Sequence, residues 1–326
     1  MINQVNLSTE LITNHGTLHL DYPVMNASGI LCFPPVLRLF APHLGVVVTK
    51  SIGPEPREGY KEPIVAYKSE TDILVNAVGL PNPGYQEFRR EIGNLEFYPL
   101  HSKDGRTPII ISIFANDPEK FAEVARGLHE YCDALELNFG CPNILPGEEI
   151  GMIIGQDPDL IYQYTSRVRK ITDKPLIAKL TPNVNHIEQI VKAAVEAGAD
   201  AISAINTISP GEVVDERGRP ILTRKQGGIS GPTVKERGLE TVRQIYSIVS
   251  IPIIGMGGIR TPQDVLGYMF AGADAVAIGT AFMGMNTSEI KNYLSGLYQG
   301  LSDEISSRGY SSLREMLDAG RRTISR

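Results

Sequence analysis

The sequence has few cysteines. Only Cys32, Cys132 and Cys141 occur among its 326 residues, and no two of them form a C-x-x-C pair. The chain cannot by itself supply four thiolates to a zinc ion or an iron–sulfur cluster. Any such cluster would have to lie on another subunit.

Basic clusters and long apolar runs are also missing. Charged residues make up 21% of the sequence, the formal net charge is -6, and no basic block suggests a nucleic-acid partner. No run of about 18 apolar residues is present, and the N-terminal segment has neither the basic nor the apolar region of a signal peptide. We therefore expect a cytoplasmic protein without a membrane span.

The sequence does contain a series of short apolar, β-branched runs, each followed by a helical pattern. Near-continuous hydrophobic runs are typical of strands covered by helices on both faces, and therefore of a parallel sheet. Eight β-then-α units predict an α/β fold, a (β/α)8 TIM barrel that spans residues 1–326 as one domain. A doubly wound sheet would more often have fewer strands and a glycine-rich turn after the first, and no G-x-G-x-x-G is found there. The runs are YPVMNAS (22–28), GVVVTK (45–50), PIIISIFA (108–115), ALELNFG (134–140), PLIAKLTP (175–182), AISAINT (201–207), IPIIGMGG (251–258) and AVAIGTA (275–281).

Helical patterns and long connections separate these runs. Three of the helical patterns open with Asp-Pro or Thr-Pro, a capping residue followed by proline in the first turn. Residues 51–107 and 208–232 are too long for simple βα loops and are predicted to be excursions over one mouth of the barrel. The helical patterns cover residues 117–131, 157–171, 185–199, 233–249 and 261–273.

The strand ends are unusually polar, and in such barrels the functional residues lie at the carboxyl ends of the strands. A lysine that ends an apolar run is costly to bury unless an anion or an electron-rich ring accompanies it, although it can also extend to water. Two such lysines at one mouth favour a ligand. The strand ends read Asn26-Ala27-Ser28-Gly29, Lys50-Ser51, Asn138 followed by Cys141, Lys179, Asn206-Thr207, Gly257-Gly258 and Gly279-Thr280.

Three glycine clusters indicate a phosphate site. GMGGIRTPQD and AIGTAF place glycines immediately before helix starts, where backbone N–H groups and the helix dipole suit an anion. QGGISGP (226–232) precedes the helix expected from Thr233 and could add donors. Glycine also serves tight turns, but the joint placement of these clusters after the last strands favours a phosphorylated cofactor.

Cys141 is the candidate acid or base. A thiol has a reference pKa near 8.5, so nearby lysines can favour a thiolate that removes a proton. A lone cysteine is otherwise a small buried hydrophobe, which is the interpretation we give Cys32 and Cys132. His186 is the one histidine next to a strand end and is expected at the surface or as a cap. No carboxylate pair lies at the strand ends, which argues against glycoside hydrolysis.

Asparagines complete the candidate site. Asn76, Asn138, Asn143 and Asn206 supply uncharged donors and acceptors, which suit a planar ring with C=O and N–H groups side by side. The stretch NAVGLPNPG (76–84) is interpreted as a loop that presents Asn76 and backbone groups to a ligand, or else as an ordinary structural turn.

Along most of its length the sequence resembles the class 1 dihydroorotate dehydrogenases, which are soluble, FMN-dependent (β/α)8 barrels of pyrimidine biosynthesis. Nine motifs occur in the order of that family, and the order makes the resemblance specific. The motifs are MNASGILC (25–32), TKSIGPEPREG (49–59), NAVGLPNPG (76–84), ELNFGCPN (136–143), KLTPNV (179–184), INT (205–207), GGISGP (227–232), IIGMGGI (253–259) and AIGTA (277–281).

The resemblance implies oxidation of dihydroorotate to orotate, with Cys141 taking a proton from C5 while a hydride passes from C6 to N5 of FMN. It implies that Lys50 lies beside both flavin and substrate and that Lys179 lies near the pyrimidine end of the flavin. The implied substrate-binding residues are Lys50, Asn76, Val78, Gly79, Leu80, Asn138, Asn143, Asn206 and Thr207. The implied FMN-binding residues are Ala27, Ser28, Lys50, Ser51, Asn138, Lys179, Ile205, Gly231, Gly257, Gly258, Gly279 and Thr280.

Three alternatives stay open at the level of sequence. The segment IGMIIGQDPDL also resembles the pyrimidine-reducing domain of dihydropyrimidine dehydrogenases, but those enzymes read CPH rather than CPN and carry their catalytic cysteine where this chain has Ile154. A homodimer that uses fumarate and a complex with an FAD and iron–sulfur subunit that uses NAD are both compatible with the motifs. A non-redox barrel with Lys179 as a Schiff base is the third.

Overall fold

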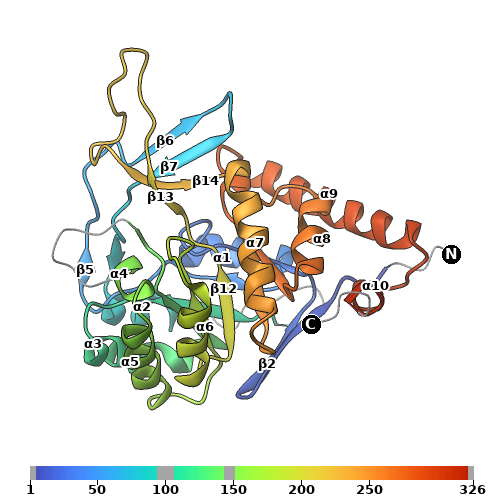
Figure 1. Ribbon diagram of the computed structural model, residues 1–326, viewed down its shortest axis with the longest axis horizontal. Helices are drawn as coiled ribbons and strands as arrows, with labels where there is room; N and C mark the ends of the chain where they lie inside the picture. Colours follow the sequence, from blue (N-terminus) through green and yellow to red (C-terminus); the bar gives the residue numbers. More distant parts are fainter. Residues whose placement is uncertain (1–4, 94–105, 143–150, 322–326) are drawn as a thin grey trace.

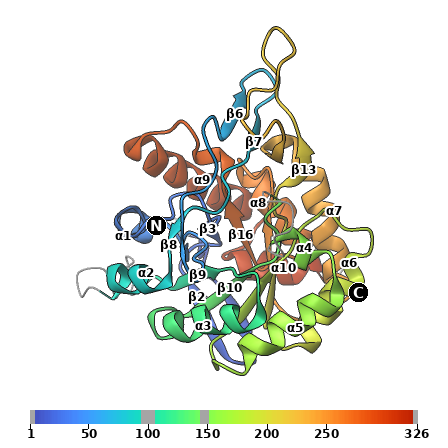
Figure 2. The ribbon, with the colours of Figure 1, turned by 90° about the vertical axis from the view of Figure 1, so that its left-hand side faces the viewer.

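The structure, a computed structural model, describes residues 5–93, 106–142 and 151–321 (Figures 1 and 2). In this part of the chain, one eight-stranded parallel sheet has the order β3-β16-β15-β12-β11-β10-β9-β4, and a parallel bridge between Met25 and Val46 closes it into a barrel. Each predicted run contains one strand, which confirms the (β/α)8 fold. The strands are β3 (Val24–Asn26), β4 (Val47–Val48), β9 (Ile109–Ile113), β10 (Ala134–Asn138), β11 (Leu176–Lys179), β12 (Ala201–Ala204), β15 (Ile253–Met256) and β16 (Ala275–Ile278).

Apolar side chains on both faces of the strands explain why these runs form a barrel. Successive residues of a strand point to opposite faces, so each run supplies two layers of the core. Val48, Ile110 and Ile254 belong to the cluster inside the barrel. Val47 and Ile109, one residue away from the first two, belong to the cluster between strands and helices.

The helices that cover the barrel begin where the capping signals predicted. The side chains of Asp117, Asp157 and Thr261 accept hydrogen bonds from backbone N–H groups of the first turns of α3, α5 and α8. His186, which precedes α6, is exposed and makes no such bond. The predicted helices are α3 (Pro118–Leu128), α5 (Pro158–Arg169), α6 (Ile187–Glu196), α7 (Lys235–Tyr246) and α8 (Pro262–Phe270); further helices are α1 (Pro34–Phe40), α2 (Tyr85–Ile92), α4 (Met152–Gly155), α9 (Thr287–Ser307) and α10 (Leu313–Arg321).

A hairpin that the sequence patterns did not predict closes the amino end of the barrel. Its strands, β1 (Thr9–Thr13) and β2 (Gly16–Leu20), pair antiparallel. Leu11, Leu18 and Leu20 of this hairpin are buried in the same cluster as the inward-facing strand residues. The barrel is therefore plugged at one end by leucine side chains.

The two predicted excursions meet over the opposite end. From the first come β6 (Val65–Lys68) and β7 (Ile73–Asn76), and from the second β13 (Ile208–Gly211) and β14 (Gly227–Ser230). These four strands form one sheet in the order β13-β14-β7-β6, at the top of Figure 1. Two short strands, β5 (Pro56–Arg57) and β8 (Asn82–Pro83), form a separate antiparallel pair.

The second excursion differs from its prediction in one respect. The QGGISGP segment was expected to lead directly into a helix from Thr233, but Gly227 and Gly228 lie inside β14. A 3-10 turn over Pro232–Val234 follows, and α7 begins at Lys235. The glycines are needed there because a Cβ at Gly227 would lie 2.2 Å from the carbonyl oxygen of Asn76 on β7.

In the described part of the chain, no helix is long and apolar enough to cross a membrane.

Candidate active site

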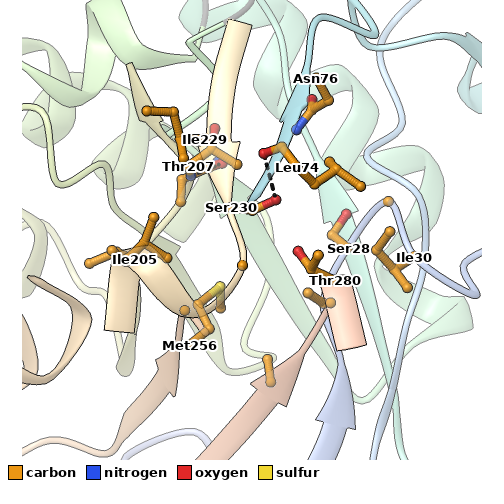
Figure 3. A pocket seen from close by; sticks show the side chains of 18 of the residues that line it. Ser28, Ile30, Leu74, Asn76, Ile205, Thr207, Ile229, Ser230, Met256 and Thr280 are labelled. Carbon is orange, nitrogen blue, oxygen red and sulfur yellow. Dashed lines mark hydrogen bonds between the residues drawn. The ribbon is translucent and has the colours of Figure 1, made fainter. Parts of the chain in front are cut away.

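A cavity of about 340 Å³ lies at the carboxyl end of the barrel. The strand ends and the loops that follow them form its floor, and β7 and β14 form its outer wall. Leu74, Asn76, Ile229 and Ser230 line it from that wall, with Ile205 and Met256 on one side of the view and Ser28 and Thr280 on the other (Figure 3). Every site residue predicted above lines this cavity except Asn143, which lies outside the described residues. The structure thus brings the polar strand ends together.

Glycines line one end of the cavity. Gly231, Gly257 and Gly258 have φ angles of +106°, +122° and +70°, in the region that favours glycine. A Cβ on Gly231 would lie 2.3 Å from the carbonyl oxygen of Asp72, and one on Gly258 would lie 2.9 Å from that of Gly231. Gly279 and Thr280 lie at the same end, where a 3-10 turn begins at Thr280. This end suits a group recognised by backbone N–H donors, such as a phosphate.

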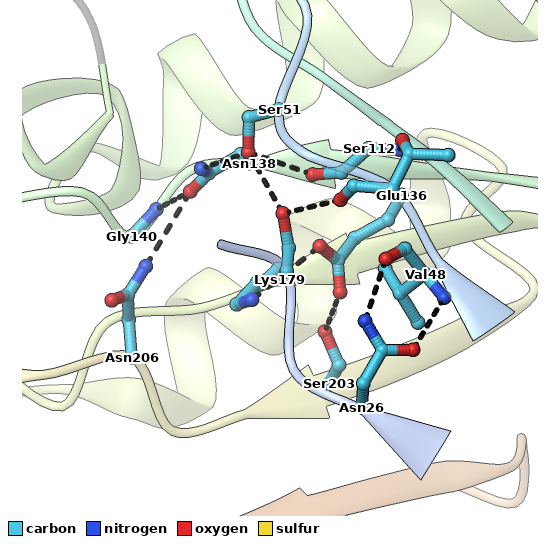
Figure 4. A network of polar contacts seen from close by, with 12 residues as sticks. Asn26, Val48, Ser51, Ser112, Glu136, Asn138, Gly140, Lys179, Ser203 and Asn206 are labelled. Atoms are coloured by element: carbon cyan, nitrogen blue, oxygen red, sulfur yellow. Dashed lines mark hydrogen bonds and ion pairs between the residues drawn. The ribbon is translucent and has the colours of Figure 1, made fainter. Parts of the chain in front are cut away.

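Lys179 reaches the cavity from the end of β11 and forms an ion pair inside the barrel. Its Nζ lies 3.4 Å from Oε1 of Glu136, and the hydroxyl of Ser203 donates to Oε2 of Glu136 at 3.2 Å (Figure 4). Lys179 and Glu136 are each only 4% exposed. The positive charge of Lys179 is therefore held in place by a carboxylate that is itself hydrogen-bonded.

Lys50, which is half-buried, supplies a second lysine to the cavity just after β4. Burial lowers the pKa of Lys50, the Cys32 and Cys141 thiols raise it, and Lys179 lowers it further. Lys50, Cys141 and Lys179 all line the cavity. An anionic ligand beside Lys50 would favour the charged form of this lysine.

Asn138 is fixed by a hydrogen-bond network at the end of β10 (Figure 4). Its Nδ2 donates to the hydroxyl of Ser51 at 2.8 Å, and its Oδ1 accepts from the Gly140 N–H at 3.2 Å and from Asn206 Nδ2 at 3.4 Å. The hydroxyl of Ser51 also contacts that of Ser112 at 2.9 Å. The amide of Asn138 is thereby oriented before any ligand binds.

Thr207 carries an unsatisfied hydroxyl beside the cavity. Among the described residues, its Oγ1 is one of two buried side-chain oxygen atoms without a hydrogen-bond partner, the other being that of Thr165. Thr207 lines the cavity, and a Cβ on Gly228 of β14 would lie 2.0 Å from this oxygen. Buried polar atoms are normally paired, so the hydroxyl of Thr207 is a candidate ligand contact.

Cys141 differs from the other two cysteines. It is half-buried and lines the cavity, where it packs with Leu80 and Phe114. Cys32 and Cys132 are buried, and burial raises the pKa of both thiols, that of Cys132 to about 12. The structure thus confirms the interpretation of Cys32 and Cys132 as core residues.

An ion pair joins the outer wall to the glycine end of the cavity. Arg260, in the loop after β15, pairs with Asp72 at the tip of the β6–β7 hairpin, with Nη2 2.8 Å from Oδ1. Asp72 also accepts a hydrogen bond from the hydroxyl of Tyr67. The wall is thus attached to the barrel at a charged contact.

Glu136, Ser112 and Arg260 were not predicted as site residues. Glu136 and Ser112 are the single polar residues within their apolar runs before the strand end, and they pair in register on β10 and β9. That isolated polarity was a signal, since a charge inside a buried run requires a partner. Asn26 is buried as well, but it bonds to backbone atoms of Val48 at the seam between β3 and β4.

The sequence is similar to known proteins along most of its length. A family model described as dihydroorotate dehydrogenase matches residues 10–300. A protein of Pyrococcus abyssi named "Dihydroorotate dehydrogenase B (NAD(+)), catalytic subunit" is 42% identical over 297 residues, which are 90% of this chain and 94% of that protein. Proteins of the same name from Thermococcus kodakarensis and Methanothermobacter thermautotrophicus are 41% and 38% identical, each over 310 residues that cover 94% of this chain and 97% of the relative.

Proposed function

The chain belongs to the dihydroorotate dehydrogenase family, and from that membership and its cavity we propose that it oxidises dihydroorotate to orotate with a bound FMN, in pyrimidine biosynthesis. The observation that carries the proposal is the placement of Cys141. Its thiol lines the same cavity as Asn76, Asn138 and Asn206, so a base and three amides face one ligand. We further propose that residues 1–326 act as one barrel domain.

The residues of the cavity fit FMN. The glycine end offers backbone donors without side chains, as a phosphate requires, and Lys179 places a cation at the floor. The apolar side chains of Ile205, Met256 and Leu74 line the cavity between these polar regions, as a planar aromatic ring requires. When bound, FMN accepts the hydride that leaves C6 of dihydroorotate.

We propose separate roles for the two lysines of the cavity and for the serines near them. Lys179, held by Glu136, supplies fixed positive charge to the flavin ring, while Lys50 lies between the flavin and the substrate. Ser28 and Ser51 belong to the same network as Asn138, because the two hydroxyls lie 3.2 Å apart. Ala27, Ile205, Gly231, Gly257, Gly258, Gly279 and Thr280 complete the proposed FMN site.

The amides orient the substrate in this proposal. Asn76, Asn138 and Asn206 bind the ring and the carboxylate of dihydroorotate, together with Asn143, the Thr207 hydroxyl and backbone groups from Val78 to Leu80. Asn138 and Asn206 are joined by a hydrogen bond, so their free donors and acceptors have fixed directions. This arrangement presents C5 of the ring to Cys141, whose thiolate removes the proton there.

The experiment that tests the function is anaerobic bleaching of the flavin. The purified chain is expected to be yellow, to lose its absorbance near the flavin maximum when dihydroorotate is added without oxygen, and to keep it when dihydrouracil is added. Bleaching by dihydrouracil instead would assign the chain to the dihydropyrimidine reaction. A colourless chain that takes up no FMN would contradict the proposal.

The dihydropyrimidine reaction is the less favoured alternative. Dihydropyrimidine dehydrogenases carry their catalytic cysteine where this chain has Ile154, and the side chain of Ile154 is fully buried in the apolar core.

Re-oxidation of the bleached chain identifies the electron acceptor. The relatives are named as catalytic subunits of an NAD(+) enzyme. We propose that this chain likewise passes electrons to a separate subunit, which carries FAD and an iron–sulfur cluster. We also propose that the chain itself forms a homodimer. NAD alone and fumarate are then expected to leave the reduced chain colourless, whereas a redox dye restores the colour. Rapid re-oxidation by fumarate would remove the need for a partner.

The hydroxyl of Thr207 gives a prediction about substrate affinity. Thr207→Val keeps the side-chain shape but removes the unpaired oxygen, and we expect orotate to bind about tenfold more weakly, the loss typical of one hydrogen bond in a buried site. Titration of the flavin spectrum with orotate measures this. The matched control is Thr165→Val, which removes the other unpaired buried hydroxyl from α5. Equal orotate affinity in the two variants would exclude Thr207 from the substrate site.

A further inference from the structure

Tyr268 lies directly behind the glycine end of the cavity. It belongs to α8 and is fully buried. Its hydroxyl donates to the carbonyl oxygen of Gly257 at 2.7 Å, and the carbonyl oxygens of Met256 and Lys235 lie farther away, at 3.3 and 3.4 Å. Gly257 and Gly258 line the cavity on the other side. The tyrosine therefore bonds to the loop from the face opposite to the cavity.

Two glycines make the space that the Tyr268 side chain occupies. A Cβ on Gly238 of α7 would lie 1.9 Å from the hydroxyl oxygen, and a Cβ on Gly255 of β15 would lie 2.5 Å from the ring. The phenol ring is thus inserted between a helix and a strand, which fixes the position of its oxygen. Of the three carbonyl oxygens within reach of the hydroxyl, that of Gly257 is the nearest.

The direction of the Gly257 carbonyl fixes the direction of the next N–H group. In a planar trans peptide the C=O of one residue and the N–H of the next point to opposite sides. The Gly257–Gly258 peptide is not among the cis bonds of the described chain. Because its C=O is held toward Tyr268, behind the loop, its N–H points to the front, where the cavity lies.

From this geometry we infer that Tyr268 is a positioning residue for the phosphate of the cofactor: it holds the Gly257 carbonyl so that the Gly258 N–H donates to a phosphate oxygen. The inference rests on the proposed function, since it takes the bound group to be FMN. Burial, assisted by the charges of Asp264 and Glu236, raises the pKa of Tyr268, so the hydroxyl keeps its proton and remains a donor throughout the neutral range. Gly257 and Gly258 can adopt their positive φ angles without a side-chain penalty, and the tyrosine selects one orientation of the peptide between them.

Comparison of FMN with riboflavin isolates the contribution of the phosphate to the binding affinity. We expect Tyr268→Phe, in the full-length chain stripped of flavin, to bind FMN about tenfold more weakly, because one charge-assisted donor loses its alignment. Riboflavin has the same ring without the phosphate, and its affinity is expected to stay unchanged. Both dissociation constants come from quenching of flavin fluorescence on titration with protein.

Two matched controls separate positioning from general loosening of the fold. Tyr298→Phe removes another buried tyrosine hydroxyl, which donates to the carbonyl oxygen of His43 at 2.7 Å. Tyr298 belongs to α9 and does not line the cavity. The Tyr298→Phe variant is expected to leave both affinities unchanged. Gly238→Ala displaces the Tyr268 hydroxyl without removing it, and it is expected to cause the same selective loss of FMN affinity. Gly267→Ala adds a Cβ with no neighbour closer than 4.0 Å, and it is expected to leave the FMN affinity unchanged.

The outcomes distinguish this inference from the function it rests on. An unmodified chain that binds no FMN contradicts the proposed function. An unmodified chain that binds FMN, with Tyr268→Phe indistinguishable from Tyr298→Phe, overturns the role of Tyr268. Equal weakening of FMN and riboflavin overturns it as well, because the hydroxyl would then support the fold and not the phosphate. Should Tyr268→Phe fail to fold, the Gly238→Ala and Gly267→Ala pair gives the decision.

Discussion

Cys141→Ala is expected to keep its FMN and to lose about a thousandfold in the rate of flavin reduction by dihydroorotate, the contribution typical of a general base. The thiol faces the cavity but lies in the loop after β10, away from the glycine end, so its removal leaves the cofactor contacts in place. Stopped-flow absorbance under anaerobic conditions measures the rate, and the visible spectrum measures the bound flavin.

Serine at the same position supplies the control for this prediction. Cys141→Ser keeps an acidic proton and the size of the side chain, but an alcohol ionises far less readily than a thiol. We expect a slow enzyme whose rate rises with pH over a range where the parent rate is already level. Cys132→Ser, at a fully buried thiol outside the cavity, should leave the pH profile unchanged. Equal rates for Cys141→Ala and the parent would exclude the thiol from the mechanism.

Glu136→Gln is expected to destabilise the chain by about 3 kcal/mol or more, because removal of one partner of a buried ion pair leaves the other charge uncompensated. Lys179 is enclosed in the barrel and has Glu136 as its carboxylate partner at 3.4 Å. Glutamine has nearly the same shape, so the loss reports the charge and not a cavity. Urea unfolding of the flavin-free chain, followed by circular dichroism, gives the free energy of unfolding.

A double variant and a surface pair test the interpretation of that loss. Glu136→Gln combined with Lys179→Met removes both charges and should recover much of the stability that Glu136→Gln alone loses. Glu240→Gln breaks an ion pair with Arg237 between largely exposed side chains and should have no measurable effect. A Glu136→Gln variant as stable as the parent would show that Lys179 does not depend on this carboxylate.

The barrel could be predicted from sequence because each strand can be recognised from the residues of its own run. Each of the eight runs is apolar on both faces, and the helices carry caps such as Asp117 and Thr261 that act within one turn. The β1–β2 hairpin could not be found in this way. Its half-buried strands alternate, with Leu11, Leu18 and Leu20 inward and residues such as Glu10, Ile12 and His19 outward, a weaker pattern than a continuous run.

The candidate site was predictable to the extent that its residues lie at strand ends. Asn138 and Lys179 are the last residues of their strands, and Lys50 and Thr207 lie shortly after theirs. Parallel strands bring their carboxyl ends to one mouth of the barrel. Contacts across the fold were not predictable, because they depend on register and packing. The Glu136–Lys179 pair joins adjacent strands 43 residues apart, and the position of the Tyr268 hydroxyl depends on space left by glycines on two other elements.

The wall of the cavity has a consequence for how the chain folds. Its strands β7 and β14 come from two excursions, and the bond between Asn76 and Gly228 joins residues 152 positions apart. Neighbouring βα units of the barrel meet across far shorter stretches, so their loop closure costs less entropy and comes earlier. The wall therefore carries a larger loop-closure entropy than the pairing of neighbouring strands, as does the β3–β16 pairing that closes the barrel between Met25 and Ala277. The enclosure of the cavity thus depends on contacts that are distant in the sequence.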